Sequence, residues 1–231
     1  MILQSSESNE IGFDIETVKD VDMIDKLPDP KVKYGNTKDP GKRKIMDENA
    51  KTKQVADMAK SPFYGRICSY AVYGNEGRIS KYSVLTEIND SAETNLIKDI
   101  FQDFANTNTI APTIITFNGE KFDMRFLYTR AVILGINELP SGCVSFKTMT
   151  KRYENENHID LMTVLYNYGE YGSLENASYV ILGKKKLDHD FSKFIELIET
   201  GQGNKIGEYN LQDAKLTYEL YKRVQPLFLG V

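Results

Sequence analysis

The sequence predicts an α/β protein built on a mixed sheet with helices on both faces. Apolar residues alternate with other residues in the opening stretch 11–17, which is typical of a strand. Residues 66–73 and 79–85 alternate in the same way, and the turn residues 74–77 between them indicate a hairpin. Beyond the hairpin, strand patterns alternate with helical periodicity. We therefore expect the first three strands to be antiparallel and the later strands to be parallel to the first.

Helix caps and stop residues divide the rest of the chain into further elements. Ser91 is a candidate N-cap, and Gly135 and Gly183 each follow an apolar periodic stretch, as glycines at helix C-termini do. The expected elements are a helix from Ser91 to about Ala105, a buried strand over 112–117, a helix over 122–134, an irregular stretch over 137–156, a short strand over 158–161 that enters a helix ending at 166, and helices over 174–182, 191–200 and 206–226.

The composition is that of an ordinary globular domain. The chain has 231 residues, of which 41% are hydrophobic, enough for one large domain or two small ones. Cys68 and Cys143 are the only cysteines, which argues against a disulfide framework or a cysteine-rich zinc site. The N-terminal residues lack a signal-peptide pattern, and no apolar run is long enough for a membrane span. We expect a cytoplasmic protein without membrane contact, or an intracellular one in a virus-infected cell.

A polar insertion over 18–61 follows the opening strand directly. The chain as a whole carries a net charge of −4, so no global positive field marks it as a nucleic-acid-binding protein. The second half of the insertion, Lys42 to Lys60, is nevertheless basic, with six Lys and Arg against three Asp and Glu. Its apolar spacing permits a helix, so we expect a flexible arm that leads into a basic helix. One hypothesis is that this arm guides single-stranded nucleic acid through phosphate contacts, and a solvated surface excursion is the alternative.

Two acids on the opening strand form the first candidate site. Asp14 and Glu16 alternate with Phe13 and Ile15, so both carboxylates project from the same face of an extended strand. Like charges repel, and both carboxylates resist removal from water. A bound divalent cation offsets that cost, although an inert strand with a solvated polar face is the alternative.

Two later segments add acids in positions that a metal site could use. Asp123 follows the polar turn after the buried strand 112–117 and lies in the first turn of the next helix, where it could also serve as a capping charge. Tyr209 and Asp213 are four residues apart, so they share one face of the last helix. Leu216 continues that face as an apolar stripe, so we expect Asp213 to point inward, where a carboxylate needs a partner.

In chain order these motifs are Asp-x-Glu at 14–16, Asn-x-x-x-Phe-Asp at 118–123 and Tyr-x-x-x-Asp at 209–213. This pattern resembles the DEDD superfamily of 3′–5′ exonucleases, in the branch with a tyrosine in the third motif. It is most similar to the proofreading domain of family-B DNA polymerases and its stand-alone relatives. The resemblance covers the chain from Glu10 to Leu227 and implies a ribonuclease H-like fold. It implies one exonuclease domain over 1–231, free-standing because polymerase palm and fingers would not fit in the remainder.

The resemblance also implies a chemistry. Two Mg²⁺ or Mn²⁺ ions would stabilise both ends of an in-line displacement at a phosphodiester, with oxygen ligands from four carboxylates. By resemblance Tyr209 positions the attacking water, a role that suits a phenol with an ordinary pKa near 10 better than that of a base. The implied residues are Asp14, Glu16, Asp123 and Asp213 as metal ligands, with Asp14 shared between the ions; the same four acids and Tyr209 as catalytic residues; and Thr17, Asn118 and Phe122 as contacts to the terminal nucleotides.

Other polar residues near these motifs are expected to be structural. His158 and His189 do not occupy the position of the histidine found in the sibling branch. Asp160 is interpreted as a strand-end cap rather than a further acid of the site. The lysine run 184–186 could hold phosphates of a substrate strand, but a solvated run after a helix-ending glycine is the favoured interpretation.

The predicted function is removal of nucleoside monophosphates from the 3′ end of single-stranded DNA, in replication proofreading or repair, with replication proteins as candidate partners. A 3′–5′ exoribonuclease that trims RNA ends is one alternative, because the motifs do not distinguish the two nucleic acids. A non-catalytic nucleic-acid-binding module of the same fold is another. The presence of all four acids and Tyr209 argues against that last alternative.

Overall fold

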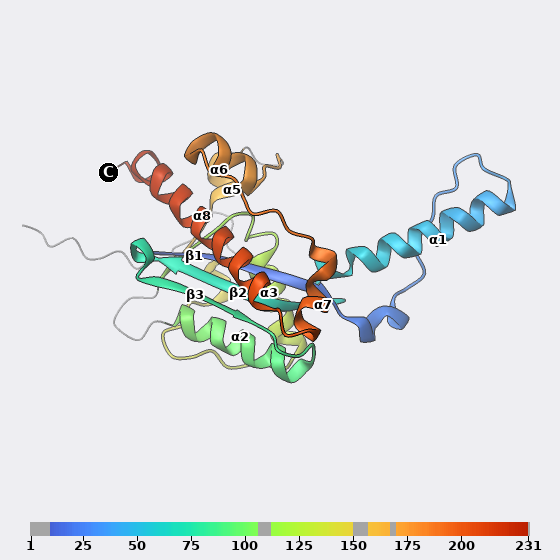
Figure 1. Cartoon of the computed structure of the whole chain (residues 1–231), viewed down its shortest axis with the longest axis horizontal. Coiled ribbons are helices and arrows are strands. Elements are labelled where there is room, and N and C mark those ends of the chain that lie inside the picture. The colour runs from blue at the N-terminus through green and yellow to red at the C-terminus, as the bar shows by residue number, and fades with distance from the viewer. Residues whose placement is uncertain (1–9, 106–111, 150–156, 167–169, 231) are drawn as a thin grey trace, which may run out of the picture.

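The computed structural model describes residues 10–105, 112–149, 157–166 and 170–230. A five-stranded sheet of order β3-β2-β1-β4-β5 forms its centre (Figure 1). Its strands are β1 (Glu10–Lys19), β2 (Gly65–Gly74), β3 (Ile79–Val84), β4 (Thr113–Thr116) and β5 (His158–Asp160). Strand β2 runs antiparallel to both β1 and β3, whereas β4 is parallel to β1 and β5 is parallel to β4. The predicted mixed sheet is therefore confirmed.

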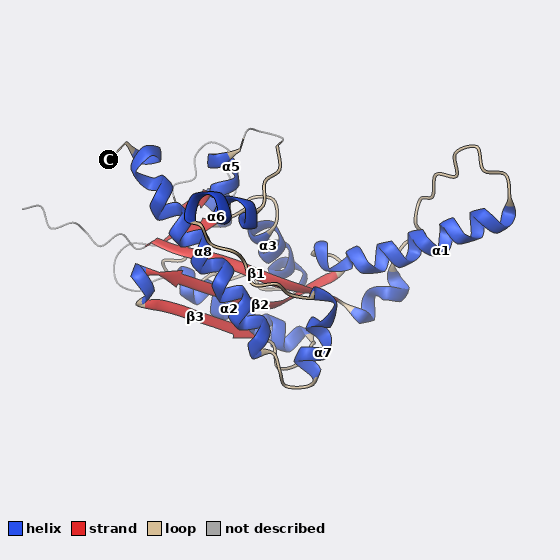
Figure 2. Cartoon of the chain, turned by 45° about the horizontal axis from the view of Figure 1, so that its top comes forward, coloured by secondary structure: helices blue, strands red, loops and turns tan. Residues whose placement is uncertain are grey.

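Helices cover both faces of the sheet. The longest, α8 (Asn204–Leu229), lies across one face with α6 (Leu174–Leu182) beside it, while α2 (Asp90–Phe104) and α3 (Asp123–Ile133) cover the other (Figure 2). The remaining helices are α1 (Pro40–Ala56), α4 (Phe146–Met149), α5 (Leu161–Leu165), α7 (Phe194–Glu199) and the short 3-10 segments η1 (Val21–Lys26), η2 (Asp57–Lys60), η3 (Asn75–Gly77) and η4 (Phe191–Lys193). Within the described residues, no helix has both the length and the apolar character that a membrane span requires.

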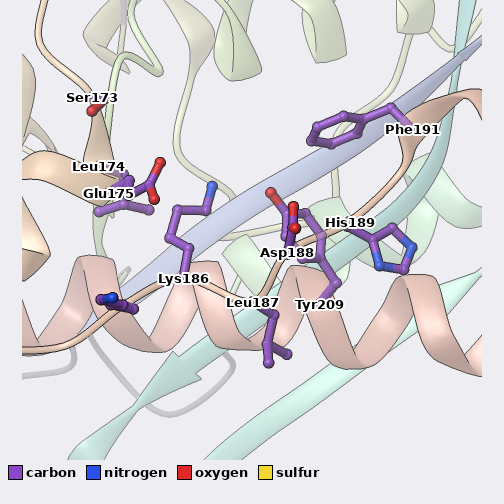
Figure 3. Close-up of a pocket in the computed structure, with 10 residues that line it drawn as sticks. Ser173, Leu174, Glu175, Lys186, Leu187, Asp188, His189, Phe191 and Tyr209 are labelled. Atoms are coloured by element: carbon purple, nitrogen blue, oxygen red, sulfur yellow. The ribbon is translucent and has the colours of Figure 1, made fainter.

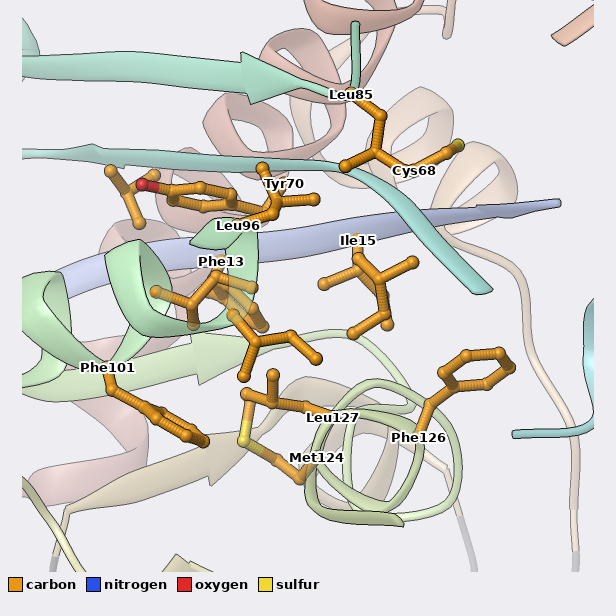
Figure 4. Packing of buried hydrophobic residues seen from close by; sticks show 14 of the residues in the cluster. Phe13, Ile15, Cys68, Tyr70, Leu85, Leu96, Phe101, Met124, Phe126 and Leu127 are labelled. Carbon is orange, nitrogen blue, oxygen red and sulfur yellow. The ribbon is translucent and has the colours of Figure 1, made fainter. Parts of the chain in front are cut away.

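The main core lies between the sheet and the α2–α3 layer (Figure 4). Phe13 and Ile15 of β1 point into this core, and the Phe13 ring meets Phe104 of α2 edge-on at 4.9 Å between centroids. Because successive side chains of a strand point to opposite faces, Asp14 and Glu16 face α8 instead. Burial of the apolar face of β1 therefore fixes the direction of its two acids.

Strand β1 and helix α8 pack so closely that a side chain does not fit between them. A Cβ added to Gly12 would lie 2.2 Å from the backbone oxygen of Ala214 in α8. Glycine is the residue that permits such a close approach of two backbones. This contact lies two residues before Asp14 and one residue after Asp213, so it sets the separation between the acids of the two elements.

A buried ionic cluster holds the end of β1 against β2 and α2. The fully buried Glu93 of α2 accepts hydrogen bonds from the Ile67 amide at 2.9 Å, from Arg66 at 3.3 Å and from Arg130 at 2.6 Å. Arg66 also forms an ion pair with Asp20 at 2.8 Å, directly after β1. Charges removed from water in this way are tolerated because each has several partners. The cluster anchors the point at which the chain leaves the sheet.

Several predicted boundaries are corrected. Helix α2 is capped by Asn89, whose side chain accepts from the Ala92 amide at 2.8 Å, and not by Ser91. The predicted helix over 191–200 divides into η4 and α7. Helix α8 begins two residues earlier than expected and continues through Pro226 to Leu229, because a proline near a helix end removes only one backbone hydrogen bond.

The Gly12 contact generates a prediction. We expect Gly12→Ala to lower the free energy of unfolding by about 1–3 kcal/mol, since overpacking forces the backbones of β1 and α8 apart. Chemical denaturation measures this change. Gly41→Ala, in the exposed first turn of α1, is the matched control and should stay within about 0.5 kcal/mol of wild type. Equal stability of Gly12→Ala and wild type would contradict the close packing.

Candidate active site

Three carboxylates meet between β1 and α8. Oxygen atoms of Asp14, Glu16 and Asp213 all lie within 4.8 Å of one another. The first two come from alternate positions of β1, and the third comes from the face of α8 that packs on the sheet. The structure thus brings together three of the four acids predicted as metal ligands.

Asp123 lies beside this cluster at the N-terminus of α3. Strand β4 pairs with β1 only from Glu10 to Gly12, so the backbone N–H of Ile15 lies beyond the β1–β4 ladder. It donates to Oδ1 of Asp123 at 3.2 Å instead. Burial raises the pKa of Asp123 to about 7. Asp123 is the first residue of α3, as the sequence indicated, but α3 has no side-chain cap. It is a neighbour of the cluster rather than part of it.

The electrostatics of the cluster favour a bound cation. Burial, followed by repulsion from Asp123, Asp213 and Glu16, raises the pKa of Asp14 well above its usual range. Burial and the Asp213 charge likewise raise the pKa of Glu16, and burial raises that of Asp213. Oδ1 of Asp213 is buried and has no hydrogen-bond partner. An unpartnered oxygen among repelling carboxylates fits the oxygen-ligand set that Mg²⁺ and Mn²⁺ prefer.

Lys186 provides a positive charge within the site. Its Nζ lies 2.5 Å from Oδ2 of Asp213, and the lysine side chain is 22% exposed. Burial opposes the charged form, but Asp213 outweighs it and the pKa of Lys186 is raised. The favoured interpretation of 184–186 as a solvated run is therefore wrong for Lys186. Lys184, which pairs with Glu219 at the surface, agrees with it.

Tyr209 connects the acids to a pocket on the α6 side. The Nζ of Lys186 lies 5.2 Å from the centre of its ring. Burial and the Asp213 charge raise the pKa of Tyr209, so the phenol keeps its proton at neutral pH. The His189 ring stacks on the tyrosine at 5.1 Å with an interplanar angle of 23°, and Phe191 meets it edge-on. His189 therefore lines the pocket, and the structural role expected for it stays a prediction.

The pocket has a volume of about 510 Å³ (Figure 3). The segment between α6 and η4 crosses α8 and contributes Lys186 and His189 to the pocket lining. Phe191, at the start of η4, lines the pocket as well, opposite Leu174 at the start of α6. The exposed fraction of Phe191 is 58%, so its ring is available to a ligand. Aromatic rings beside a cationic side chain are typical of sites that bind nucleotides by stacking and charge.

Asn210 is a site residue that the sequence patterns did not single out. Its amide Nδ2 donates to Oδ2 of Asp14 at 2.6 Å, and its Oδ1 accepts from the Ser69 hydroxyl at 2.9 Å. The side chain is fully buried, and the two hydrogen bonds fix its orientation. A signal was present in the sequence, since Asn210 lies three residues before Asp213 and so belongs to the same inward face of the helix.

The three residues predicted to contact the terminal nucleotides differ in the hydrogen bonding and packing of their side chains. Thr17 donates its hydroxyl to the backbone oxygen of Ala59 at 2.7 Å. Asn118 has a left-handed backbone with φ +70°, and its side-chain oxygen is buried without a partner. Phe122 is partly buried and packs against Phe126 at 5.5 Å, so its ring belongs in part to the core. Their contacts to substrate stay predictions.

Asp160 has the capping role that the sequence indicated. It accepts from the amide of Met162 at 3.0 Å, which caps α5, and from the amides of Asn118 at 2.7 Å and Glu120 at 3.0 Å. It therefore holds the turn that precedes Asp123. His158 is buried and lies 2.8 Å from the Thr116 hydroxyl through Nε2, consistent with the expected structural role.

Residues 60–228 match the model of a family described as "Predicted 3'-5' exonuclease related to the exonuclease domain of PolB". Sequence relatives include "DNA polymerase 1" of Pyrococcus abyssi, 34% identical over 126 residues, and "DNA polymerase 1" of Sulfurisphaera ohwakuensis, 29% identical over 198 residues. These alignments cover 49% and 72% of this chain, but only 16% and 20% of the relatives.

The fold also matches a solved structure. The family B DNA polymerase from the hyperthermophilic archaeon Pyrobaculum calidifontis aligns with a TM-score of 0.55 and 18% identity, over 75% of this chain and 24% of that chain. At this identity the likeness supports the fold alone. The predicted ribonuclease H-like α/β class is confirmed.

The raised carboxyl pKa values predict a pH dependence in metal-free protein. Between the unfolded pKa of Asp123, near 4, and its folded pKa of about 7, the unfolded chain loses a proton that the folded protein retains. The free energy of unfolding should therefore fall as pH rises through this window, and Asp14 and Glu16 should add to the fall. Melting temperatures in EDTA at about pH 5 and pH 8 measure it.

Two further measurements test whether the carboxylate cluster causes this pH dependence. Mg²⁺ or Mn²⁺ should raise the melting temperature more at the higher pH, where the carboxylates are ionised. Asp14→Asn, which removes one repelling charge, should be more stable than wild type in EDTA at the higher pH. Parallel pH profiles for wild type and Asp14→Asn would contradict the assignment.

Proposed function

Because the chain belongs to the family of predicted 3′–5′ exonucleases related to the exonuclease domain of PolB, we propose that it is a metal-dependent exonuclease acting on single-stranded DNA. It removes nucleoside monophosphates from the 3′ end by phosphodiester hydrolysis. We place this activity in replication proofreading or repair, with replication proteins as partners. We assign a single exonuclease domain to residues 1–231, with a basic insertion at about 18–61.

The carboxylate cluster is the observation that carries this proposal. Asp14, Glu16 and Asp213 are held within 4.8 Å of one another with raised pKa values, and Asp213 retains a buried oxygen without a partner. With Asp123 they would hold two Mg²⁺ or Mn²⁺ ions, and by resemblance to the exonuclease family Asp14 would be the ligand shared between them. Bound divalent cations neutralise charge on the phosphate and lower the pKa of water.

The protein's own side chains position the reacting groups. Asn210 holds one oxygen of Asp14 and leaves the other free for a ligand. Tyr209 keeps its proton, so it orients a water molecule or a phosphate oxygen by hydrogen bonding and does not act as the base. Lys186 stands at the pocket side of Asp213, where its ammonium group can neutralise a phosphate oxygen of the terminal nucleotide.

DNA is preferred over RNA as the substrate because the sequence relatives are named DNA polymerases. RNA trimming is a second candidate, because the pocket lining is polar and could accept a 2′-hydroxyl. Recognition of that group depends on the shape of the pocket. A non-catalytic binding module is the weaker alternative, because it would have no use for four acids whose mutual repulsion is costly.

An exonuclease assay tests the proposal. Wild-type protein with Mg²⁺ or Mn²⁺ should shorten 5′-labelled single-stranded DNA stepwise from its 3′ end, and EDTA should stop the reaction. Asp14→Asn should lower the rate by about 10³-fold or more, as expected for loss of a central catalytic group. Asp99→Asn, an exposed acid on α2, is the matched control and should retain full activity.

Two other results of this assay would change the assignment of the substrate or of the mechanism. Faster shortening of an RNA of the same sequence would reassign the substrate. Undiminished digestion by Asp14→Asn, or digestion in EDTA, would overturn the mechanism.

The Asn210 hydrogen bonds generate a separate prediction. Asn210→Leu keeps the side-chain volume but leaves Asp14 without its amide partner, so metal affinity or turnover should fall by about 10–100-fold. Titration of activity against Mn²⁺ distinguishes these two effects. Asn176→Leu, at the exposed start of α6, serves as the control. Wild-type metal dependence in Asn210→Leu would show that Asp14 needs no such support.

A further inference from the structure

Residues 21–57, called the arm from here on, project away from the body of the molecule (Figure 1). They comprise η1, an extended return segment, α1 and the first residue of η2. The arm leaves the sheet directly after β1, and its base lies beside α7 in both views (Figures 1 and 2). Thr17, next to Glu16 of the carboxylate cluster, hydrogen bonds to Ala59 at the base. The arm is therefore attached at the end of the strand that carries two of the acids.

The arm contributes nothing to the core. None of its residues is buried, and α1 has no buried side chain along its 17 residues. It is held mainly by its own contacts, such as the Tyr34 hydroxyl to Asp47 at 2.7 Å, and Arg43, which lies 5.0 Å from the Tyr34 ring centre and donates to the Thr37 backbone. An isolated helix of this length is marginally stable in water. A role in stabilising the fold does not account for such a segment.

The outer part of the arm, residues 31–44, is strongly basic and is called the tip. It contains six Lys and Arg and one Asp, whereas the rest of the chain contains 23 Lys and Arg and 32 Asp and Glu. All six cations are exposed: Lys31, Lys33, Lys38, Lys42, Arg43 and Lys44. The single acid, Asp39, accepts from the amides of Gly41 and Lys42 as the N-cap of α1. The tip is thus a positive site on a negatively charged protein, and it is complementary to a polyanion.

The geometry relates this site to the substrate strand. Helix α1 has 17 residues and spans about 25 Å, which a stacked single strand covers in about seven nucleotides. On the basis of the proposed exonuclease function, we infer that the tip binds the phosphate backbone of the same strand whose 3′ end lies in the carboxylate cluster, about seven nucleotides or more from that end. Binding there retains the strand between successive cleavages without contacting the reacting phosphate.

Strand length and salt distinguish this inference from a general charge effect. The tip variant replaces Lys31, Lys33, Lys38, Lys42 and Lys44 by Gln and keeps Arg43, which holds the arm together. The control variant replaces five exposed cations of the body by Gln: Lys98, Arg125, Lys147, Lys215 and Arg223. Both sets are combined with Asp14→Asn, and anisotropy measures binding to oligothymidylates of roughly 5 and 20 nucleotides over a salt series.

The tip variant should bind the longer strand at least ~10-fold more weakly. The slope of log K against log salt should decrease in magnitude by about 0.7 for each phosphate that the tip no longer neutralises. Both variants should bind the shorter strand as the parent does. Hydrogen exchange should show protection of α1 with the longer strand only. Equal affinity of the tip and control variants for the longer strand would overturn the inference, as would weakened binding of the shorter strand in the tip variant alone.

A mononucleotide ester separates this result from the proposed function. The tip variant with Asp14 intact should hydrolyse the p-nitrophenyl ester of thymidine 5′-monophosphate like wild type, because this substrate is too short to reach the tip. If wild type hydrolyses neither the ester nor an oligonucleotide, the exonuclease proposal fails. If wild type hydrolyses both and the tip variant processes long strands like wild type, only the inference about the arm fails.

Discussion

The backbone contact between β1 and α8 at Gly12 is the constraint on which the site depends. Because no side chain separates the two elements there, the acids of a central strand and of the last helix are held within 4.8 Å of one another. Their repulsion and burial oppose folding, and the apolar packing of Phe13 and Ile15 on the opposite face resists their separation. The site is therefore a region of stored electrostatic strain in a well-packed protein, which is a common property of functional sites.

Most of the fold and the acids of the site could be predicted because they depend on local periodicity. The alternation around Asp14 and Glu16 determines which face carries their carboxylates, whatever the rest of the chain does. The spacing of Tyr209 and Asp213 places both on the inward face of one helix in the same way. These predictions hold in the folded protein because the side-chain periodicity of a strand or a helix does not depend on the elements that pack against it. Asp123 was assigned to the site through the resemblance to the exonuclease family, because its place in the first turn of a helix indicated only a capping charge.

The remaining features depend on packing between distant segments. Lys184 and Lys186 occupy similar sequence contexts, and only the path of the chain across α8 directs one to solvent and the other to Asp213. The stacking of His189 on Tyr209 arises from the same path. The α2 cap was misplaced by two residues because Asn89 and Ser91 are both good caps, and the extended backbone at Asn89, with φ −150° and ψ 169°, decides between them.

The attachment of the arm allows its sequence and length to change without a change in the sheet. Strands β1 and β2 are antiparallel neighbours, and the Asp20 amide donates to the Tyr64 backbone oxygen at 2.9 Å, so the segments that lead into and out of the arm are joined at its base. An insertion whose ends already meet costs little more when it lengthens, because loop-closure entropy grows only slowly with length. Descendants of this protein could therefore gain, lose or exchange the arm by insertion and deletion while the catalytic strand stays unchanged. Substrate preference and hydrolytic chemistry would then evolve on separate parts of one chain.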